Sequence, residues 1–330
     1  MTVHNSSKLS QEEMEQEDDY FRKVISRYSK YQDFAHVKLR KMTLDYNKSV
    51  PEHHKRRLGD LFTQKLLAMK DAIATNQNFI NQMIEGHVSE PESESDDVED
   101  NDGNGKSSED GDEKASFQTH MGFHQAETDM DNVCSSLRQF IRDWSAEGQA
   151  ERESCYGPIL KVLDSVFSPD KRGGIKVLVP GSGLGRLAYE IAQMGFVCQG
   201  NEFSYYMLIG SEMMLNRVRH REQYRLCPYA LQVSNVKSTL LQTREIAIPD
   251  IVPDLSNIAS VAAANEISLP PFSMVAGDFL QVYADQYSEW DVVVTCFFMD
   301  TAKNPLLYMD YIHRLLKPGG RWINFGRVYK

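Results

Sequence analysis

The sequence predicts a doubly wound α/β fold preceded by a helical module, and three observations lead to this prediction. Short apolar runs alternate with amphipathic helical patterns from residue 175 onward. A glycine-rich turn, "PGSGLG" at 180–185, joins the first apolar run to a helix. The residues before 117 instead show helical spacing followed by an acidic tract. Parallel strands joined by crossover helices form a Rossmann-like sheet, which binds ligands at the carboxyl ends of its strands.

Residues 1–87 are predicted to be the N-terminal helical module. Helical spacing covers 10–46 and 51–86, with Phe21, Val24, Ile25, Tyr28 and Tyr31 three or four residues apart. Pro51 stands at the start of the second stretch, where a helix needs no N–H donor. We interpret the module as a cap packed on the main domain; an independent bundle that binds a partner is the alternative.

Residues 88–116 are predicted to be an acidic, disordered linker between the module and the main domain at 117–330. The linker holds twelve Asp and Glu against two Lys, a net of −10, out of −11 for the whole chain. Such a composition has almost nothing to bury and serves as a spacer. Phosphorylation of serines such as Ser93, Ser95 and Ser108 is the alternative role. The near-neutral remainder, which has no basic stripe, argues against nucleic acid as a partner.

The main domain begins with two helical stretches and continues as a strand and helix alternation. Helices are expected at 129–148 and 151–167, then a strand at 175–180, a helix at 186–195 and a strand at 196–202. Further strands are expected at 272–279, 290–298 and 321–326, with a helix at 304–316 and a turn at 317–320. No apolar run approaches the roughly 18 residues that a membrane span needs, so we expect no membrane contact.

The glycine turn carries the first chemical information. Gly181, Gly183 and Gly185 follow the spacing G-x-G-x-G, which is usual in S-adenosylmethionine-dependent methyltransferases and differs from the dinucleotide pattern G-x-G-x-x-G. Glu202 ends the next strand, where its carboxylate can accept hydrogen bonds from both ribose hydroxyls. "AGDF" then offers Asp278 for an adenine amino group and the Phe279 ring for the face of the base. These elements in this order predict an S-adenosylmethionine site.

Longer phrases carry a more specific resemblance. The segments "VLVPGSGLGRLAYEIAQMGFVCQGNEFSYYMLIGSEMMLNR", "TCFFMDTAKN" and "LLKPGGRWINFG" resemble the carnosine N-methyltransferase family, and the match extends from about residue 20 to residue 326. The resemblance implies transfer of a methyl group from S-adenosylmethionine to an imidazole nitrogen of carnosine, giving anserine. Related histidine-containing dipeptides are further substrates that it implies. It also implies a homodimer in the cytoplasm and nucleus, and methylation of the nitrogen nearer the β-carbon.

The resemblance also assigns site residues. It implies cofactor contacts from the set Gln139, Arg142, Gly181, Glu202, Asp278, Phe279 and Cys296. Arg142 is suited to the methionine carboxylate, and Gln139 to the same end of the cofactor. On the substrate side, Asp310 matches a family aspartate that contacts the imidazole, and Asp300 lies just beyond the fourth strand, where the acceptor is usually positioned. A carboxylate beside one imidazole N–H fixes the tautomer and leaves the other nitrogen as the nucleophile.

Other features of the sequence concern metal binding, the cysteines and the extent of the family pattern. His120 and His124 have metal-like spacing but no third ligand, so no metal site is predicted. The five scattered cysteines form no CxxC pair, which favours reduced thiols. The family pattern continues beyond this chain, so we expect a truncated form that lacks the final strands and substrate contacts. A protein-histidine or RNA methyltransferase, or an inactive form that acts only as a binding protein, are the alternatives.

Overall fold

A central parallel sheet organises the fold in the computed structural model, which describes residues 11–87, 128–254 and 271–327. Five strands lie in the order β5-β2-β1-β6-β7, and every neighbouring pair is parallel. The chain runs outward from β1 on one side, then crosses to β6 and β7 on the other. This reversal of direction beside β1 places a ligand-binding crevice at the carboxyl ends of the strands.

The strands agree closely with the sequence prediction. The sheet contains β1 (Lys176–Pro180), β2 (Val197–Glu202), β5 (Phe272–Ala276), β6 (Trp290–Cys296) and β7 (Leu316–Phe325). Most of β1 and β6 is buried, as expected for parallel strands covered on both faces.

The beginning of β7 departs from the prediction. Pairing with β6 shifts from Trp290↔Leu316 to Val292↔Arg321, so the expected turn at 317–320 is an irregularity within the strand. Gly319 allows it, with a φ of 81°. Lys317 within this irregularity pairs with Asp291 on β6, Nζ to Oδ1 at 2.8 Å, which ties the two strands together at their beginnings.

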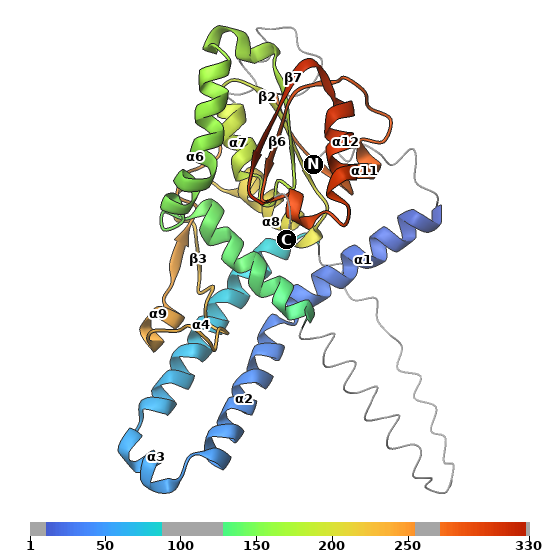
Figure 1. The fold of residues 1–330 in the computed structure, drawn as a ribbon. Helices are drawn as coiled ribbons and strands as arrows, with labels where there is room; N and C mark the ends of the chain where they lie inside the picture. The colour runs from blue at the N-terminus through green and yellow to red at the C-terminus, as the bar shows by residue number, and fades with distance from the viewer. Residues whose placement is uncertain (1–10, 88–127, 255–270, 328–330) are drawn as a thin grey trace, which may run out of the picture.

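Helices cover both faces of the sheet (Figure 1). The helix α6 (Gln149–Val166) and the helix α7 (Arg186–Gln193) lie on one side, and α11 (Phe279–Val282) and α12 (Pro305–Leu315) lie on the other. A helix over residues 128–144 precedes α6 and lies below the sheet. The two faces bury separate apolar clusters: Val177 and Val292 belong to one, and Leu178 and Val293 to the other. The predicted helices flanking the sheet are therefore present.

The N-terminal helices pack on the sheet domain. They are α1 (Gln11–Ser29), α2 (Tyr31–Ser49), α3 (Glu52–Leu58) and α4 (Leu61–Ile84), so each predicted long helix is interrupted once. A turn at Lys30 separates α1 from α2, and Gly59, with a φ of 53°, ends α3. The fully buried Tyr28 hydroxyl lies 2.9 Å from both Ser136 Oγ and the Tyr206 carbonyl oxygen. The core thus continues without a break from these helices into the sheet domain.

The structure contains a two-stranded antiparallel ribbon that was not predicted from the sequence. The short strands β3 (Tyr224–Leu226) and β4 (Ile246–Ile248) pair antiparallel. They follow α8 (Tyr205–Glu212) and precede β5 in the chain, and the segment that joins them contains the helix α9 (Thr239–Thr243). The ribbon packs against α4 through Phe79 and Tyr224, whose ring centroids are 5.8 Å apart. Asn76 of α4 bonds both the N–H and the carbonyl of Cys227.

Several predictions fall on residues outside the described ranges. The acidic linker at 88–116 and the histidine pair His120 and His124 are among them. Across residues 11–87, 128–254 and 271–327, no helix has the length and apolar character to cross a membrane. The same residues contain no group of three or more His, Cys, Asp or Glu arranged for a metal ion.

Candidate active site

The glycine turn leaves β1 and begins α7 at the carboxyl edge of the sheet. Gly181, Gly183 and Gly185 have φ values of 65°, 56° and 81°, a region that residues with a Cβ seldom adopt. Space is also limiting at the first of them, because a Cβ on Gly181 would lie 2.5 Å from the Phe298 ring. The turn therefore requires glycine and exposes backbone to whatever lies above it.

Glu202 is bonded directly to this turn. Its Oε2 accepts a hydrogen bond from the Gly183 N–H at 2.8 Å, and its Oε1 accepts two more from Phe203 and Ser204 at 2.9 and 2.8 Å. Burial raises the pKa of the Glu202 carboxyl above its ordinary value, against the opposite effect of the three N–H donors. Carboxylate oxygens accept about four hydrogen bonds in total, so Oε2 keeps room for one donor. This remaining direction on Oε2 suits one ribose hydroxyl. For Glu202 to accept hydrogen bonds from both ribose hydroxyls, as the sequence predicts, one of the three backbone N–H donors has to be displaced.

Asp278 and Phe279 differ in what they leave for a ligand. Asp278 caps α11, and its Oδ1 accepts from Leu280 and Gln281, while no contact within the described ranges engages Oδ2. Phe279 is only 3% exposed and its ring lies edge-on to Phe298 at 5.5 Å between centroids. The predicted carboxylate therefore keeps one oxygen for a ligand, whereas the predicted ring is packed in the core between α11 and α12.

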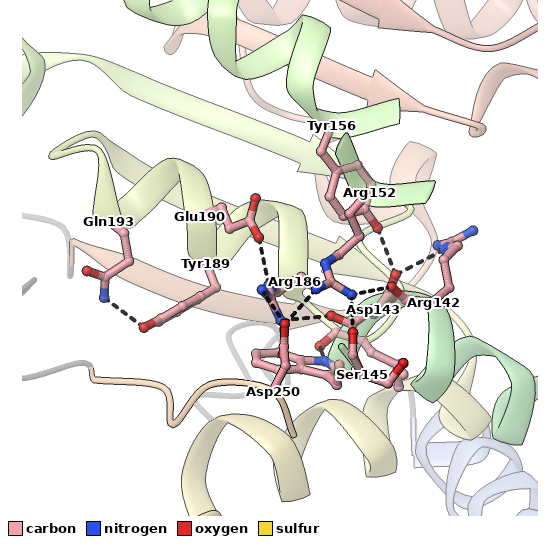
Figure 2. A network of polar contacts seen from close by, with 12 residues as sticks. Arg142, Asp143, Ser145, Arg152, Tyr156, Arg186, Tyr189, Glu190, Gln193 and Asp250 are labelled. Carbon is pink, nitrogen blue, oxygen red and sulfur yellow. Dashed lines mark hydrogen bonds and ion pairs between the residues drawn. The ribbon is translucent and has the colours of Figure 1, made fainter. Parts of the chain in front are cut away.

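Gln139 and Arg142 stand on the helix over residues 128–144, and a third residue that the sequence analysis missed joins them. Asp143 accepts hydrogen bonds from Arg142 Nε at 3.0 Å and from the Tyr156 hydroxyl at 2.8 Å (Figure 2). It also accepts one from Gln139 Nε2 at 2.8 Å. Burial is the largest single effect on the pKa of Arg142 and acts to lower it, but the charge and hydrogen bond of Asp143, together with the nearby Tyr156 and Glu151, raise the pKa overall. Gln139 reaches the turn, because a Cβ on Gly183 would lie 3.6 Å from its Nε2.

Figure 2 also shows a second network of polar contacts, which includes Arg186, the residue that directly follows the glycine turn. Arg186, the first residue of α7, contacts Asp250 Oδ1 through Nη1 at 2.6 Å and Glu190 through Nε at 2.7 Å. Arg152 of α6 contacts Asp250 Oδ2 at 2.5 Å. Arg186 also donates to the backbone carbonyl of Asp143 at 2.9 Å, which ties this network to the helix that carries Gln139 and Arg142.

Cys296 and Asp300 lie where β6 ends. Burial raises the pKa of the Cys296 thiol to about 12, with the nearby charge of Arg142 acting in the opposite direction. Asp300 lies in the short 3-10 helix Met299–Thr301, and its Oδ1 is buried with no hydrogen-bond partner among the described residues. A buried carboxylate oxygen without a donor is costly, so this atom is an obvious position for a ligand N–H.

Asp310 occupies a different environment. Its side chain is exposed on α12, whose buried side is formed by Ile312 and Leu315. No hydrogen bond or ion pair joins Asp310 to another described residue. Of the two predicted substrate carboxylates, only Asp300 has the buried, unpaired oxygen that a bound imidazole would satisfy.

The strand order, the glycine turn after β1 and the acid that ends β2 define a Rossmann-like fold of the class I methyltransferase type. The family model for carnosine N-methyltransferase matches residues 119–329, which is more than half of the chain. The protein therefore belongs to the carnosine N-methyltransferase family.

Two relatives and one solved structure are similar to parts of this chain. Carnosine N-methyltransferase of Rattus norvegicus is 46% identical over 203 residues, covering 60% of this chain and 47% of the relative. Carnosine N-methyltransferase unmet of Drosophila melanogaster is 34% identical over 327 residues, covering 94% and 66%. A putative S-adenosyl-L-methionine-dependent methyltransferase from Methanococcus maripaludis aligns with a TM-score of 0.29 and 18% identity, covering 54% of this chain and 61% of that one. The chain spans about half the length of most of the curated relatives that it matches.

Proposed function

We propose that the chain binds S-adenosylmethionine at the carboxyl edge of β1, β2 and β5 and methylates an imidazole nitrogen of carnosine and related histidine-containing dipeptides, giving anserine from carnosine. The observation that carries the cofactor part is the bond between Glu202 and Gly183, which places a buried carboxylate beside a turn of bare backbone. Membership of the family supports the acceptor. When bound, the cofactor supplies a methyl group on a positively charged sulfur.

The residues present fit the proposed cofactor at three points. Glu202 Oε2 retains one acceptor direction for a ribose hydroxyl, and Asp278 Oδ2 retains both of its directions for an adenine amino group. Arg142 uses Nε for Asp143, so its two Nη groups remain for a carboxylate. All three groups belong to segments that meet at the carboxyl edge of the sheet or at the glycine turn.

On the acceptor side, Asp300 positions the imidazole. Its Oδ1 accepts the N–H of the ring nitrogen farther from the β-carbon, so the nearer nitrogen presents its lone pair to the methyl group. The cofactor would supply the methyl group and leave as the neutral thioether, and the methylated ring would be cationic. Asp300 or water would then accept the N–H proton of the ring. Imidazole is largely neutral at pH 7, with an ordinary pKa of about 6.5, so alignment contributes more than base strength.

Mass spectrometry with isotope label tests this proposal. The chain is incubated with carnosine and S-adenosylmethionine carrying a trideuteriomethyl group, and the product is compared with authentic anserine and its ring isomer. We expect labelled anserine, and at least a tenfold loss of rate for Asp300→Asn, because the amide is a poorer acceptor and cannot take the proton. Asp164→Asn is the control and should retain activity, since its exposed carboxylate pairs with Arg172 and belongs to no part of the candidate site.

Binding of S-adenosylhomocysteine is measured on the same samples because the chain spans about half the length of most of its curated relatives. Cofactor binding together with label on a protein histidine or on RNA, and none on carnosine, would reject the proposed acceptor. Absence of cofactor binding would reject the proposed function as a whole.

A further inference from the structure

Asp143 carries a buried charge that has no role in the reaction proposed above. Its residue is 1% exposed, yet its carboxylate accepts hydrogen bonds from three side chains, Gln139, Arg142 and Tyr156. Burying a carboxylate costs free energy unless hydrogen-bond donors replace water. The three donors therefore compensate for the burial of Asp143, and the carboxylate in turn holds their side chains in place. Two of these donors are residues that the sequence analysis assigned to the cofactor.

The carboxylate lies beside the glycine turn. A Cβ placed on Gly183 would lie 3.6 Å from Gln139 Nε2 and 3.9 Å from Asp143 Oδ2. Gly183 is also the residue whose N–H donates to Glu202. The Asp143 network and the proposed ribose carboxylate therefore approach the same glycine from two sides.

The hydrogen bonds fix what Gln139 and Arg142 offer to a ligand. Gln139 donates through Nε2 to Asp143 Oδ2, so its Oε1 is directed elsewhere and can accept from an ammonium group. Arg142 donates through Nε to Asp143 Oδ1, so its two Nη groups are the ones left for a carboxylate. An ammonium and a carboxylate on one carbon are the two charged groups of an amino acid.

We propose that Asp143 is a positioning residue that orients Gln139 and Arg142 toward the amino-acid end of S-adenosylmethionine, an inference that rests on the proposed function. Asp143 contacts no ligand itself and acts through these two side chains. Asp143→Asn keeps the size of the side chain but replaces one acceptor oxygen by an N–H₂ donor. That donor faces either Gln139 Nε2 or Arg142 Nε, so at least one of the two side chains loses its orientation.

A purely structural role for Asp143 makes a different prediction. Its backbone carbonyl accepts from Arg186 Nη1 at 2.9 Å, and this contact survives any change of the side chain. If Asp143 only stabilised the helix, then Asp143→Asn would affect all ligands of the site equally. If it positions Gln139 and Arg142, the loss appears only for ligands that carry the amino-acid group.

Calorimetry with two ligands separates these cases. S-adenosylhomocysteine carries the amino-acid group, and 5′-methylthioadenosine has the same adenosine but lacks it. We expect Asp143→Asn to weaken binding of S-adenosylhomocysteine at least tenfold and binding of 5′-methylthioadenosine less than twofold. Arg142→Gln should show the same selectivity, and the double variant should lose less than the product of the two single losses.

Tyr156→Phe gives an independent test that keeps the carboxylate in place. It removes one donor from Asp143 Oδ1, and we expect about a threefold loss for S-adenosylhomocysteine with 5′-methylthioadenosine unchanged. This variant decides the matter if Asp143→Asn does not fold. Equal losses for both ligands, or none for either, would overturn the positioning role while leaving the proposed function intact. Failure of the unaltered chain to bind either ligand would overturn both.

Discussion

Asp250→Asn should destabilise the protein strongly, because Asp250 is the shared counter-charge of two buried arginines. The side chains of Arg152 and Arg186 are each 6% exposed, and that of Asp250 is 11% exposed. Burial and the charge of Arg186 lower the pKa of Arg152, and the negative charges of Asp250, Glu190 and Asp143 act in the opposite direction. Removing one partner of a buried ion pair costs about 3–5 kcal/mol.

The expected shift in melting temperature follows from this energy. For a domain of about 200 residues, 1 kcal/mol corresponds to roughly 2–4 °C, so Asp250→Asn should lower Tm by roughly 6–20 °C. Thermal unfolding followed by circular dichroism measures the shift. The loss should also reach the glycine turn, because Arg186 is the first residue of α7 and directly follows Gly185.

Asp164→Asn is the matched control for this prediction. Asp164 contacts Arg172 Nη2 at 2.5 Å, the same distance that separates Asp250 from Arg152, but its side chain is 67% exposed. The Arg172 side chain is only 7% exposed, but the carboxylate that is changed lies largely in water. A pair with such an exposed carboxylate contributes about 0–1 kcal/mol, so Tm should fall by only a few degrees. Equal shifts for the two variants would refute the argument that burial, and not the ion pair as such, determines the cost.

Three further predictions concern the core, the thiol and the cofactor carboxylate. Tyr28→Phe should lower the free energy of unfolding by about 1–2 kcal/mol in urea titrations, because the Tyr206 carbonyl and Ser136 lose a buried donor; no change would mean that water replaces it. Cys296, whose pKa burial raises to about 12, should react with iodoacetamide at pH 8 at least a hundredfold more slowly than a cysteine peptide, and an equal rate would contradict this burial. Affinity for S-adenosylhomocysteine should fall on acidification as Glu202 gains a proton. Because burial raises the pKa of Glu202, the fall should begin above the ordinary glutamate pKa of about 4.3. The Glu202→Gln variant should lack this pH dependence. The same raised pKa means that Glu202 favours the folded, ligand-free protein at low pH, and that this contribution is lost as the pH rises through the folded-state pKa.

The parts of the fold that the sequence predicted are those with a local signature. Strands such as β1 are short apolar runs, and the turn after β1 needs three residues with positive φ, which only glycine supplies at little cost. Glu202 was predictable because the end of the second strand lies beside that turn in any sheet of this type.

The parts that the sequence did not predict depend on distant contacts. The strands β3 and β4 have three residues each, too few for a periodic pattern, and the chain between them is 19 residues long. Asp250 meets Arg152 and Arg186 across 98 and 64 residues. No spacing rule connects such positions, so only the folded chain reveals that they form one network.

Within the site, local signals existed but did not settle the roles. Gln139 and Asp143 are four residues apart on one helix, a spacing at which side chains meet, so Asp143 could have been found from the sequence. Residue type does not distinguish Asp300 from Asp310; only burial in the folded chain separates them. The ring of Phe279 was assigned to adenine by its position after Asp278, whereas packing against α12 places it in the core.

A titration of S-adenosylhomocysteine into the chain tests the central claim most directly, since every proposed role depends on a cofactor bound at the glycine turn. Calorimetry should show one site per chain, with Glu202→Ala at least tenfold weaker, about 1.4 kcal/mol, because an acceptor for the ribose is removed beside Gly183. Asp164→Asn should bind as the unaltered chain does, since its exposed carboxylate pairs with Arg172 and belongs to no part of the proposed site. If the folded Glu202→Ala variant and the unaltered chain bound S-adenosylhomocysteine with equal affinity, this result would contradict the proposed site.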